Sequence, residues 1–169
     1  RDYQKVLKKL FVIQDLSAWS PTLRSKATVR TSDIRHFCDP AVAAYFLNAS
    51  PKNLMDDLHT FGFLFESLVV RDLRVYSGVY GGTVHHYRDS NDLEVDCIVH
   101  LRDGRWGAIE VKLGAGMVDP AAANLRKLSE VVDEEAVGRP SFLAVVTGTE
   151  YAYRREDGVY VVPIGCLRP

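Results

Sequence analysis

The sequence lacks the signatures of several protein classes. It has no run of about 18 apolar residues and no signal peptide, so it offers no membrane-spanning segment. Its three cysteines (Cys38, Cys97 and Cys166) are far apart and form no C-x-x-C pair. This spacing argues against a zinc site or a disulfide framework and favours a reducing cytoplasm.

Strong charge of either sign is also lacking. The net charge is −1 over 169 residues, which argues against binding nucleic acid by bulk electrostatics but leaves room for a local basic patch. Hydrophobic residues make up 47% of the chain, which is typical of a folded globular protein. The length suits one domain, or one domain with a small appendage.

Residues 1–50 have the pattern of the second half of a winged helix. Residues 2–10 predict an amphipathic helix, residues 11–13 and 34–38 predict two strands, and Trp19 anchors the polar connection between them. Basic residues gather in and after this connection: Arg24, Lys26, Arg30 and Arg35, with His36 as a fifth candidate. We interpret them as a solvated wing, with contact to DNA as the alternative.

A second short helix is predicted over residues 41–47. Asp39 supplies an N-cap and Pro40 the first helical position. Because the sequence begins at Arg1, inside the first predicted helix, we expect the chain to be a fragment of a longer protein whose upstream part holds the rest of the winged helix.

The longest helical pattern covers residues 54–75. Its segment 61–70, FGFLFESLVV, is apolar almost all round and carries one charge, Glu66. A helix of this kind is expected to be buried, and a lone carboxylate within it requires a cation or a hydrogen-bond donor.

The remainder predicts a mixed α/β fold. Strands are expected over residues 83–88, 93–99 and 106–112, followed by a helix over 121–135 that Asp119-Pro120 begins, and by a buried strand over 141–147. A last hairpin pairs residues 151–155 with 159–163 around Glu156-Asp157-Gly158. The core order is therefore αβββαβ, with a mixed sheet.

Charged side chains converge on the predicted hairpin of residues 93–112. Strand alternation places Asp96, Glu110 and Lys112 on one face of two paired strands. Together with Glu66, these carboxylates suit Mg²⁺ or Mn²⁺, which prefer oxygen ligands. Lys112 is placed to orient an attacking water or to stabilise a phosphate, and Glu94 is a supporting group near the hairpin edge.

These residues resemble the PD-(D/E)XK nuclease superfamily, whose fold is restriction-endonuclease-like. The resemblance rests on Asp96-x13-Glu110-x-Lys112 on adjacent strands, with Glu66 on the preceding helix. The strings FCDPAVAAYFL, FGFLFESLVVRDL, RDSNDLEVDCIV, GRWGAIEVKLG and VYVVPIGCL resemble more closely the uncharacterised C-terminal domain of prokaryotic AAA-type ATPases. One departure is Val95, which stands where the superfamily signature has proline.

The resemblance implies a winged-helix portion at residues 1–50 and a nuclease-like domain at 51–169. It implies a metal-dependent domain that acts on DNA phosphodiester bonds, with Glu66, Asp96 and Glu110 as metal ligands and Asp96, Glu110 and Lys112 as catalytic residues. An upstream ATPase module is the expected partner within the same polypeptide. No G-x-x-x-x-G-K-[ST] motif is present, so these residues contain no P-loop site for ATP.

Several alternatives remain open. Glu66 is also explained as a structural glutamate paired with Lys112 or an arginine, and the strand carboxylates as a surface salt-bridge cluster. The domain is equally explained as a catalytically inactive module of the ATPase that binds nucleic acid or protein, and a toxin–antitoxin or defence component is a third reading. Two further groups have both a nucleic-acid-binding and a solvent-exposed interpretation: Arg126 with Lys127, and Tyr151, Tyr153, Arg154 and Arg155.

Overall fold

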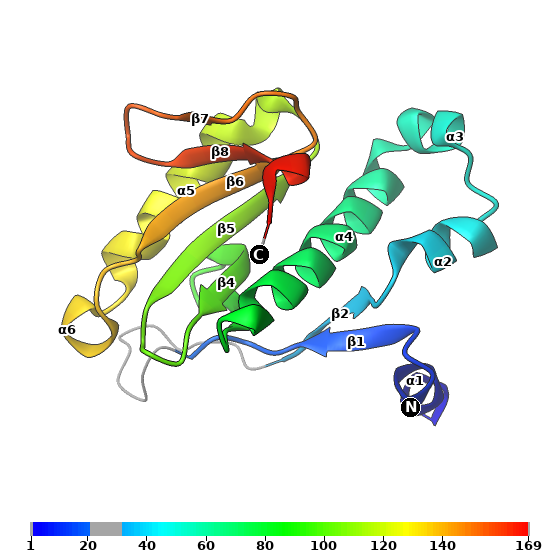
Figure 1. The fold of residues 1–169 in the computed structure, drawn as a ribbon, viewed down its shortest axis with the longest axis horizontal. Helices are drawn as coiled ribbons and strands as arrows, with labels where there is room; N and C mark the ends of the chain where they lie inside the picture. Colours follow the sequence, from blue (N-terminus) through cyan, green and yellow to red (C-terminus); the bar gives the residue numbers. More distant parts are fainter. Residues whose placement is uncertain (1, 21–31, 169) are drawn as a thin grey trace.

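The fold is a twisted mixed sheet with one long helix on each face (Figure 1). It is seen in a computed structural model that describes residues 2–20 and 32–168. The helices are α1 (Asp2–Lys9), α2 (Pro40–Phe46), α3 (Pro51–Asp56), α4 (Leu58–Val79), α5 (Val118–Val131) and α6 (Glu134–Val137). The strands are β1 (Ile13–Leu16), β2 (Ile34–Phe37), β3 (Thr83–Arg88), β4 (Glu94–His100), β5 (Trp106–Lys112), β6 (Phe142–Thr147), β7 (Tyr153–Arg154) and β8 (Tyr160–Pro163).

The main sheet has six strands in the order β3-β4-β5-β6-β8-β7. The meander β3, β4 and β5 is antiparallel, β5–β6 and β6–β8 are parallel, and β7 and β8 form an antiparallel hairpin. The order α4-β3-β4-β5-α5-β6 confirms the predicted αβββαβ core. Short 3-10 turns lie at Ala115–Met117 and Ile164–Cys166.

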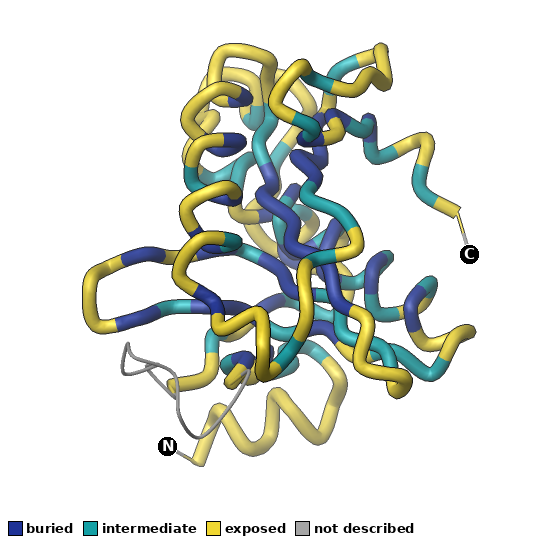
Figure 2. The backbone as a smooth tube through the Cα atoms, turned by 90° about the vertical axis from the view of Figure 1, so that its left-hand side faces the viewer, coloured by how far each residue is buried: buried dark blue, intermediate teal, exposed yellow. Residues whose placement is uncertain are grey.

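Two hydrophobic clusters bind the helices to the two faces of this sheet. On one face, Leu125 and Leu128 of α5 pack with Ile98 and Ala108. On the other face, Val69 and Val70 of α4 pack with residues that include Ile109. Figure 2 shows the buried positions concentrated along the strands, with the outer sides of the helices exposed.

The predicted N-terminal strand pair is present, with a correction at its start. β1 and β2 are antiparallel, and Gln14 pairs with His36. The prediction of a strand at residues 11–13 was wrong because Phe11 takes a positive φ of 55°, so the chain turns there after α1 and the strand begins at Ile13. The predictions for Arg24, Lys26 and Arg30 lie outside the described residues.

Trp19 is an anchor, as predicted, and it lies in the main core. It is 3% exposed and its indole packs against Trp106, with ring centroids 4.7 Å apart. Its backbone N–H donates to the His86 carbonyl at 2.6 Å, and the His86 N–H donates to the Ser17 carbonyl. Residues 17–19 therefore run along the edge of β3 that does not pair with β4. The division of domains at residue 50 stays a prediction.

The single helix predicted over residues 54–75 is two helices. Asp57 separates α3 from α4 with φ −122° and ψ 77°, and its side chain accepts a hydrogen bond from the Thr60 N–H as the N-cap of α4. The apolar periodicity continues from α3 into α4, so the sequence pattern does not reveal the break between the two helices. α5 likewise begins at Val118, which places Asp119 in the first turn and not at the N-cap. Among the described helices, none has the length and apolar character needed to cross a membrane.

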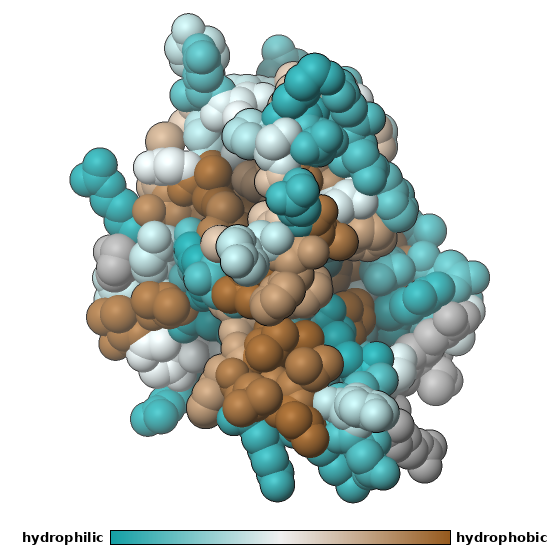
Figure 3. Space-filling view, turned by 90° about the vertical axis from the view of Figure 1, so that its right-hand side faces the viewer, coloured by the Kyte–Doolittle hydropathy of each residue, from teal (hydrophilic) through white to brown (hydrophobic). Residues whose placement is uncertain are grey.

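The helix predicted to be buried all round is exposed on one side. Within residues 61–70, Phe63 is 59% exposed, because α4 has the sheet on one side only. The predicted inward side of α1 is also exposed, from Tyr3 to Leu10. Figure 3, which faces the side of the molecule on which α2 and α4 lie, shows a broad hydrophobic surface there.

Candidate functional site: a split between β4 and β5

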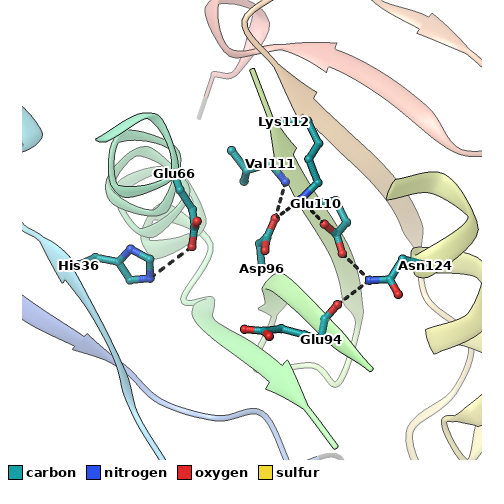
Figure 4. Close-up of polar contacts among 8 residues, drawn as sticks. All are labelled: His36, Glu66, Glu94, Asp96, Glu110, Val111, Lys112 and Asn124. Carbon is teal, nitrogen blue, oxygen red and sulfur yellow. Dashed lines mark hydrogen bonds and ion pairs between the residues drawn. The ribbon is translucent and has the colours of Figure 1, made fainter. Parts of the chain in front are cut away.

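The candidate site lies where the pairing of β4 and β5 stops. The ladder runs from His100↔Trp106 to Cys97↔Ile109 and does not continue to Asp96. Instead, the Asp96 carboxylate accepts a hydrogen bond from the Val111 N–H at 2.8 Å (Figure 4). A side chain thus replaces the backbone partner, and the two strands part around it.

The predicted alternation along β4 is interrupted at the same place. Val95 and Cys97 were expected on one face, but they pack in the opposite clusters. The register between β3 and β4 shifts at His86. The backbone of His86 forms hydrogen bonds with Ser17 and Trp19 and none with β4. A bulge of this kind re-aims the side chains beside it. Here it leaves Asp96 in the split between β4 and β5.

Lys112 joins the two strand carboxylates. Its Nζ lies 2.7 Å from Glu110 Oε2 and 3.1 Å from Asp96 Oδ2. Burial acts to lower the pKa of Lys112, but the charges of Asp96 and Glu110 outweigh it, so the pKa is raised and the amine is an ammonium. The structure therefore brings Asp96, Glu110 and Lys112 together, as the sequence predicted.

Glu110 is held by a residue that the sequence analysis missed. Asn124 of α5 donates to Glu110 Oε1 at 2.6 Å and to the Glu94 backbone carbonyl at 2.5 Å. Burial, followed by the charge of Asp96, raises the pKa of Glu110 above its usual range. Asn124 lies three residues after buried Ala121 and four before buried Leu128, so a polar side chain on that stripe was a detectable signal.

Glu66 faces this cluster from α4. Burial, and then the charge of Asp96, raises the pKa of Glu66 to about 7, although the Lys112 ammonium opposes the shift. Its side chain keeps 27% of its surface exposed, and with Lys112 and Val111 it lines a pocket of about 480 Å³. The prediction that α4 brings a carboxylate to the strand cluster agrees with this geometry.

His36 is the second residue that sequence analysis did not assign to the site. Its Nε2 lies 3.9 Å from Glu66 Oε1 (Figure 4). Its Nδ1 lies 3.4 Å from the Ser67 hydroxyl. Burial and the charge of Arg74 lower its pKa to about 4, so the contact with Glu66 involves a neutral ring and is not an ion pair. The link from β2 to α4 spans 31 positions, which no local pattern reveals.

Glu94 contributes less than expected. Its carboxylate lies 3.6 Å from Arg88 Nη1, and its contact with the cluster is made through the backbone carbonyl that Asn124 binds. Its charge still reaches Glu66 and helps to raise the pKa of that residue. Glu94 thus acts on the site through its charge, which affects Glu66, and through its backbone carbonyl, which binds Asn124.

The donor set suits a hard divalent cation. Glu66, Asp96 and Glu110 supply oxygen ligands of the kind that Mg²⁺ and Mn²⁺ bind. Burial, and after it the charge of Asp96, raises the pKa values of Glu66 and Glu110, although the Lys112 ammonium opposes both shifts. Within residues 2–20 and 32–168, no three His, Cys, Asp or Glu side chains are already arranged around a metal position. A cation would therefore have to displace the Lys112 ammonium from between the two strand carboxylates.

The fold and the cluster define a mixed α/β domain with a partly buried carboxylate–lysine site at a split in its sheet. Residues 61–167 match the model of a family described as a domain of unknown function, DUF4143, so the chain belongs to this family. No curated protein and no solved structure matches the chain. The family segment contains Glu66, Asp96, Glu110, Lys112 and Asn124, whereas His36 lies before it.

Proposed function

We propose that this domain is a metal-dependent nuclease-like domain of the PD-(D/E)XK kind, which hydrolyses DNA phosphodiester bonds. The observation that carries the proposal is the split between β4 and β5, where Asp96, Glu110 and Lys112 meet and Glu66 faces them from α4. Placing three carboxylates and a lysine in a partly buried site is costly unless their charges are paired. Clusters of this kind, with shifted pKa values, are typical of functional sites.

The proposal gives each side chain a role. Glu66, Asp96 and Glu110 would hold Mg²⁺ or Mn²⁺, which when bound neutralises a phosphodiester and activates water. Lys112, once displaced from the carboxylates, would orient the attacking water or stabilise the charge that develops on phosphate. Asn124 keeps Glu110 in place through the 2.6 Å hydrogen bond.

The proposal extends to the setting of the domain. We propose that it is the C-terminal domain of a prokaryotic AAA-type ATPase and acts in the cytoplasm. The resemblance of its segments to such domains supports the first part. The three free cysteines support the second, because reduced thiols persist in a reducing compartment.

A comparison of two aspartate variants tests the proposal. Titration calorimetry should detect Mn²⁺ or Mg²⁺ binding to the unmodified chain, and incubation with supercoiled, linear and single-stranded DNA should give cleavage. Asp96→Ala should abolish both. Asp103→Ala, which removes an exposed carboxylate in the turn of the same hairpin, should retain both. Absence of metal binding, with Asp96→Ala changing nothing, would refute the proposal.

One observation favours a second candidate function. The Lys112 ammonium pairs with both strand carboxylates, which would also stabilise a site that binds no metal. In that case the domain is a non-catalytic module of the ATPase that binds DNA or a protein. It would cleave no form of DNA with any divalent ion, yet would show a salt-dependent affinity for DNA or retain a protein partner.

A further inference from the structure

The N-terminal strand pair brings a buried imidazole to the candidate site. His36 is 5% exposed and lies on β2 against α4. Its Nε2 has no hydrogen-bond partner among the described residues and lies 3.9 Å from Glu66 Oε1. A buried polar atom without a partner is rare in folded proteins and requires an explanation.

The opposite ring nitrogen determines what Nε2 can offer. Nδ1 lies 3.4 Å from the Ser67 hydroxyl on α4. The neutral ring has a single N–H. If the Ser67 hydroxyl donates to Nδ1, the ring proton is on Nε2 and points toward the Glu66 carboxylate. The 3.9 Å between Nε2 and Glu66 Oε1 exceeds hydrogen-bond distance, so the bond requires the Glu66 carboxylate to move toward the ring.

The strand pair that carries His36 is fixed to α4. Arg74 of α4 donates to the Asp15 carbonyl on β1. Leu16 of β1 is fully buried in the cluster that contains Val69 and Val70 of α4. Because β1 pairs with β2, these contacts hold the strand that carries His36 against α4. This is what a group that orients another side chain requires.

We propose that His36 is a positioning residue of the metal site: it donates its Nε2–H to Glu66 and holds that carboxylate toward Asp96 and Lys112. The inference rests on the proposed function. It adds that the site extends beyond the family segment 61–167, because a residue that precedes this segment completes the surroundings of Glu66. A hydrogen-bond donor behind a ligating carboxylate sets the orientation in which the carboxylate meets an ion.

The test is Mn²⁺ binding to the whole 169-residue chain, measured by calorimetry and by electron paramagnetic resonance of free Mn²⁺. His36→Leu should raise the Kd for Mn²⁺ by about tenfold or more, since loss of such supporting contacts costs about 10–100-fold in metal affinity. His36→Gln places an amide N–H near the position of Nε2 and should stay within about threefold of the unmodified chain. His36→Asn has the same amide but is one carbon shorter, and it should bind as weakly as His36→Leu.

His100→Leu is the matched control. His100 is a half-buried imidazole at the C-terminal end of β4, where its ring lies edge-on to that of Trp19 with centroids 6.1 Å apart. Its loss should leave the affinity for Mn²⁺ within about twofold of the unmodified chain, even if it lowers stability. If His36→Leu does not fold, the pair His36→Gln and His36→Asn decides the question.

The outcomes separate this inference from the proposed function. If the unmodified chain binds no Mn²⁺, the proposed function and this inference both fail. If it binds Mn²⁺ and folded His36 variants bind equally well, only the role of His36 is refuted. The same holds if His100→Leu weakens binding as much as His36→Leu, because the effect would then be general loss of structure.

Discussion

At the scale of single residues, the candidate site contains more carboxyl groups than amines. Glu66, Asp96 and Glu110 face one ammonium, that of Lys112. Burial raises the free energy of each ionised carboxylate, and their mutual repulsion adds to it. Protons or a divalent cation can relieve this excess, so the two should compete for the site.

This competition gives a prediction for Glu66→Gln in protein treated with EDTA. The pKa of Glu66 is about 7 in the folded chain against an ordinary value of 4.5, so the folded state binds this proton more tightly than the unfolded state does. The resulting stabilisation is complete below about pH 4.5 and is lost as the pH rises through about 7. Glutamine has no proton to lose. The stability of Glu66→Gln relative to the unmodified chain should therefore increase across that range.

Urea denaturation at a series of pH values measures this difference. The lowered pKa of His36, about 4, acts in the opposite direction and below the range in which Glu66 loses its proton, so the rise near pH 7 reports on residue 66. Glu130→Gln, which removes an exposed carboxylate from α5, is the control. A stability difference for Glu66→Gln that does not change with pH would contradict the prediction.

At the scale of elements, the site depends on how closely β5 approaches β6. Gly107 of β5 pairs with Phe142 of β6, and the Phe142 ring lies over the glycine. A Cβ at residue 107 would come within 2.3 Å of Phe142 Cε1, a distance that only displacement of the ring would relieve. The glycine thus permits the parallel pairing that also aligns Glu110 with Val145 and Lys112 with Thr147.

Gly107→Ala should destabilise the fold by about 1–3 kcal/mol, the usual cost of overpacking a well-packed core. Equilibrium urea denaturation measures this as a lower midpoint with an unchanged slope. Gly165→Ala is the control, because a Cβ there meets no atom within 4 Å in the described residues, and it should change stability by less than about 0.5 kcal/mol. Equal stability of the two variants would be evidence against this packing.

At the scale of the whole molecule, the family segment 61–167 shares its core with the residues before it. Trp19 packs against Trp106 and Tyr87, with ring centroids 4.7 Å and 6.4 Å away. Leu16 lies in the cluster under α4. The segment that carries His36 is therefore joined to the domain through both of its hydrophobic clusters.

Trp19→Ala should cost about 3–5 kcal/mol, the usual range for truncating a buried tryptophan. Urea denaturation followed by circular dichroism measures the loss and does not depend on the fluorescence that the substitution removes. Tyr45→Ala, at a side chain that is 79% exposed, should cost less than about 0.5 kcal/mol. A cost for Trp19→Ala no greater than that for Tyr45→Ala would show that the N-terminal segment is not part of the core.

Local sequence determined most of the elements. Alternation and turn residues were sufficient to predict the meander β3, β4 and β5, because adjacent antiparallel strands follow from short-range pattern. The same pattern placed Asp96, Glu110 and Lys112 together, since they lie on one hairpin. The sequence determined the boundaries of the elements less well. The apolar periodicity continues across Asp57, so it does not indicate that one helix ends and another begins there.

Tertiary structure alone decided how the site is completed. His36 and Asn124 reach Glu66 and Glu110 from other elements, and the packing of those elements depends on contacts between distant parts of the chain. The split at Asp96 likewise depends on a bulge against β3, where His86 bonds to the segment after β1 and not to β4. The sequence by itself determined which charged groups exist and which share a hairpin. Only the folded chain decided what surrounds them, because burial and long-range hydrogen bonds have no local pattern.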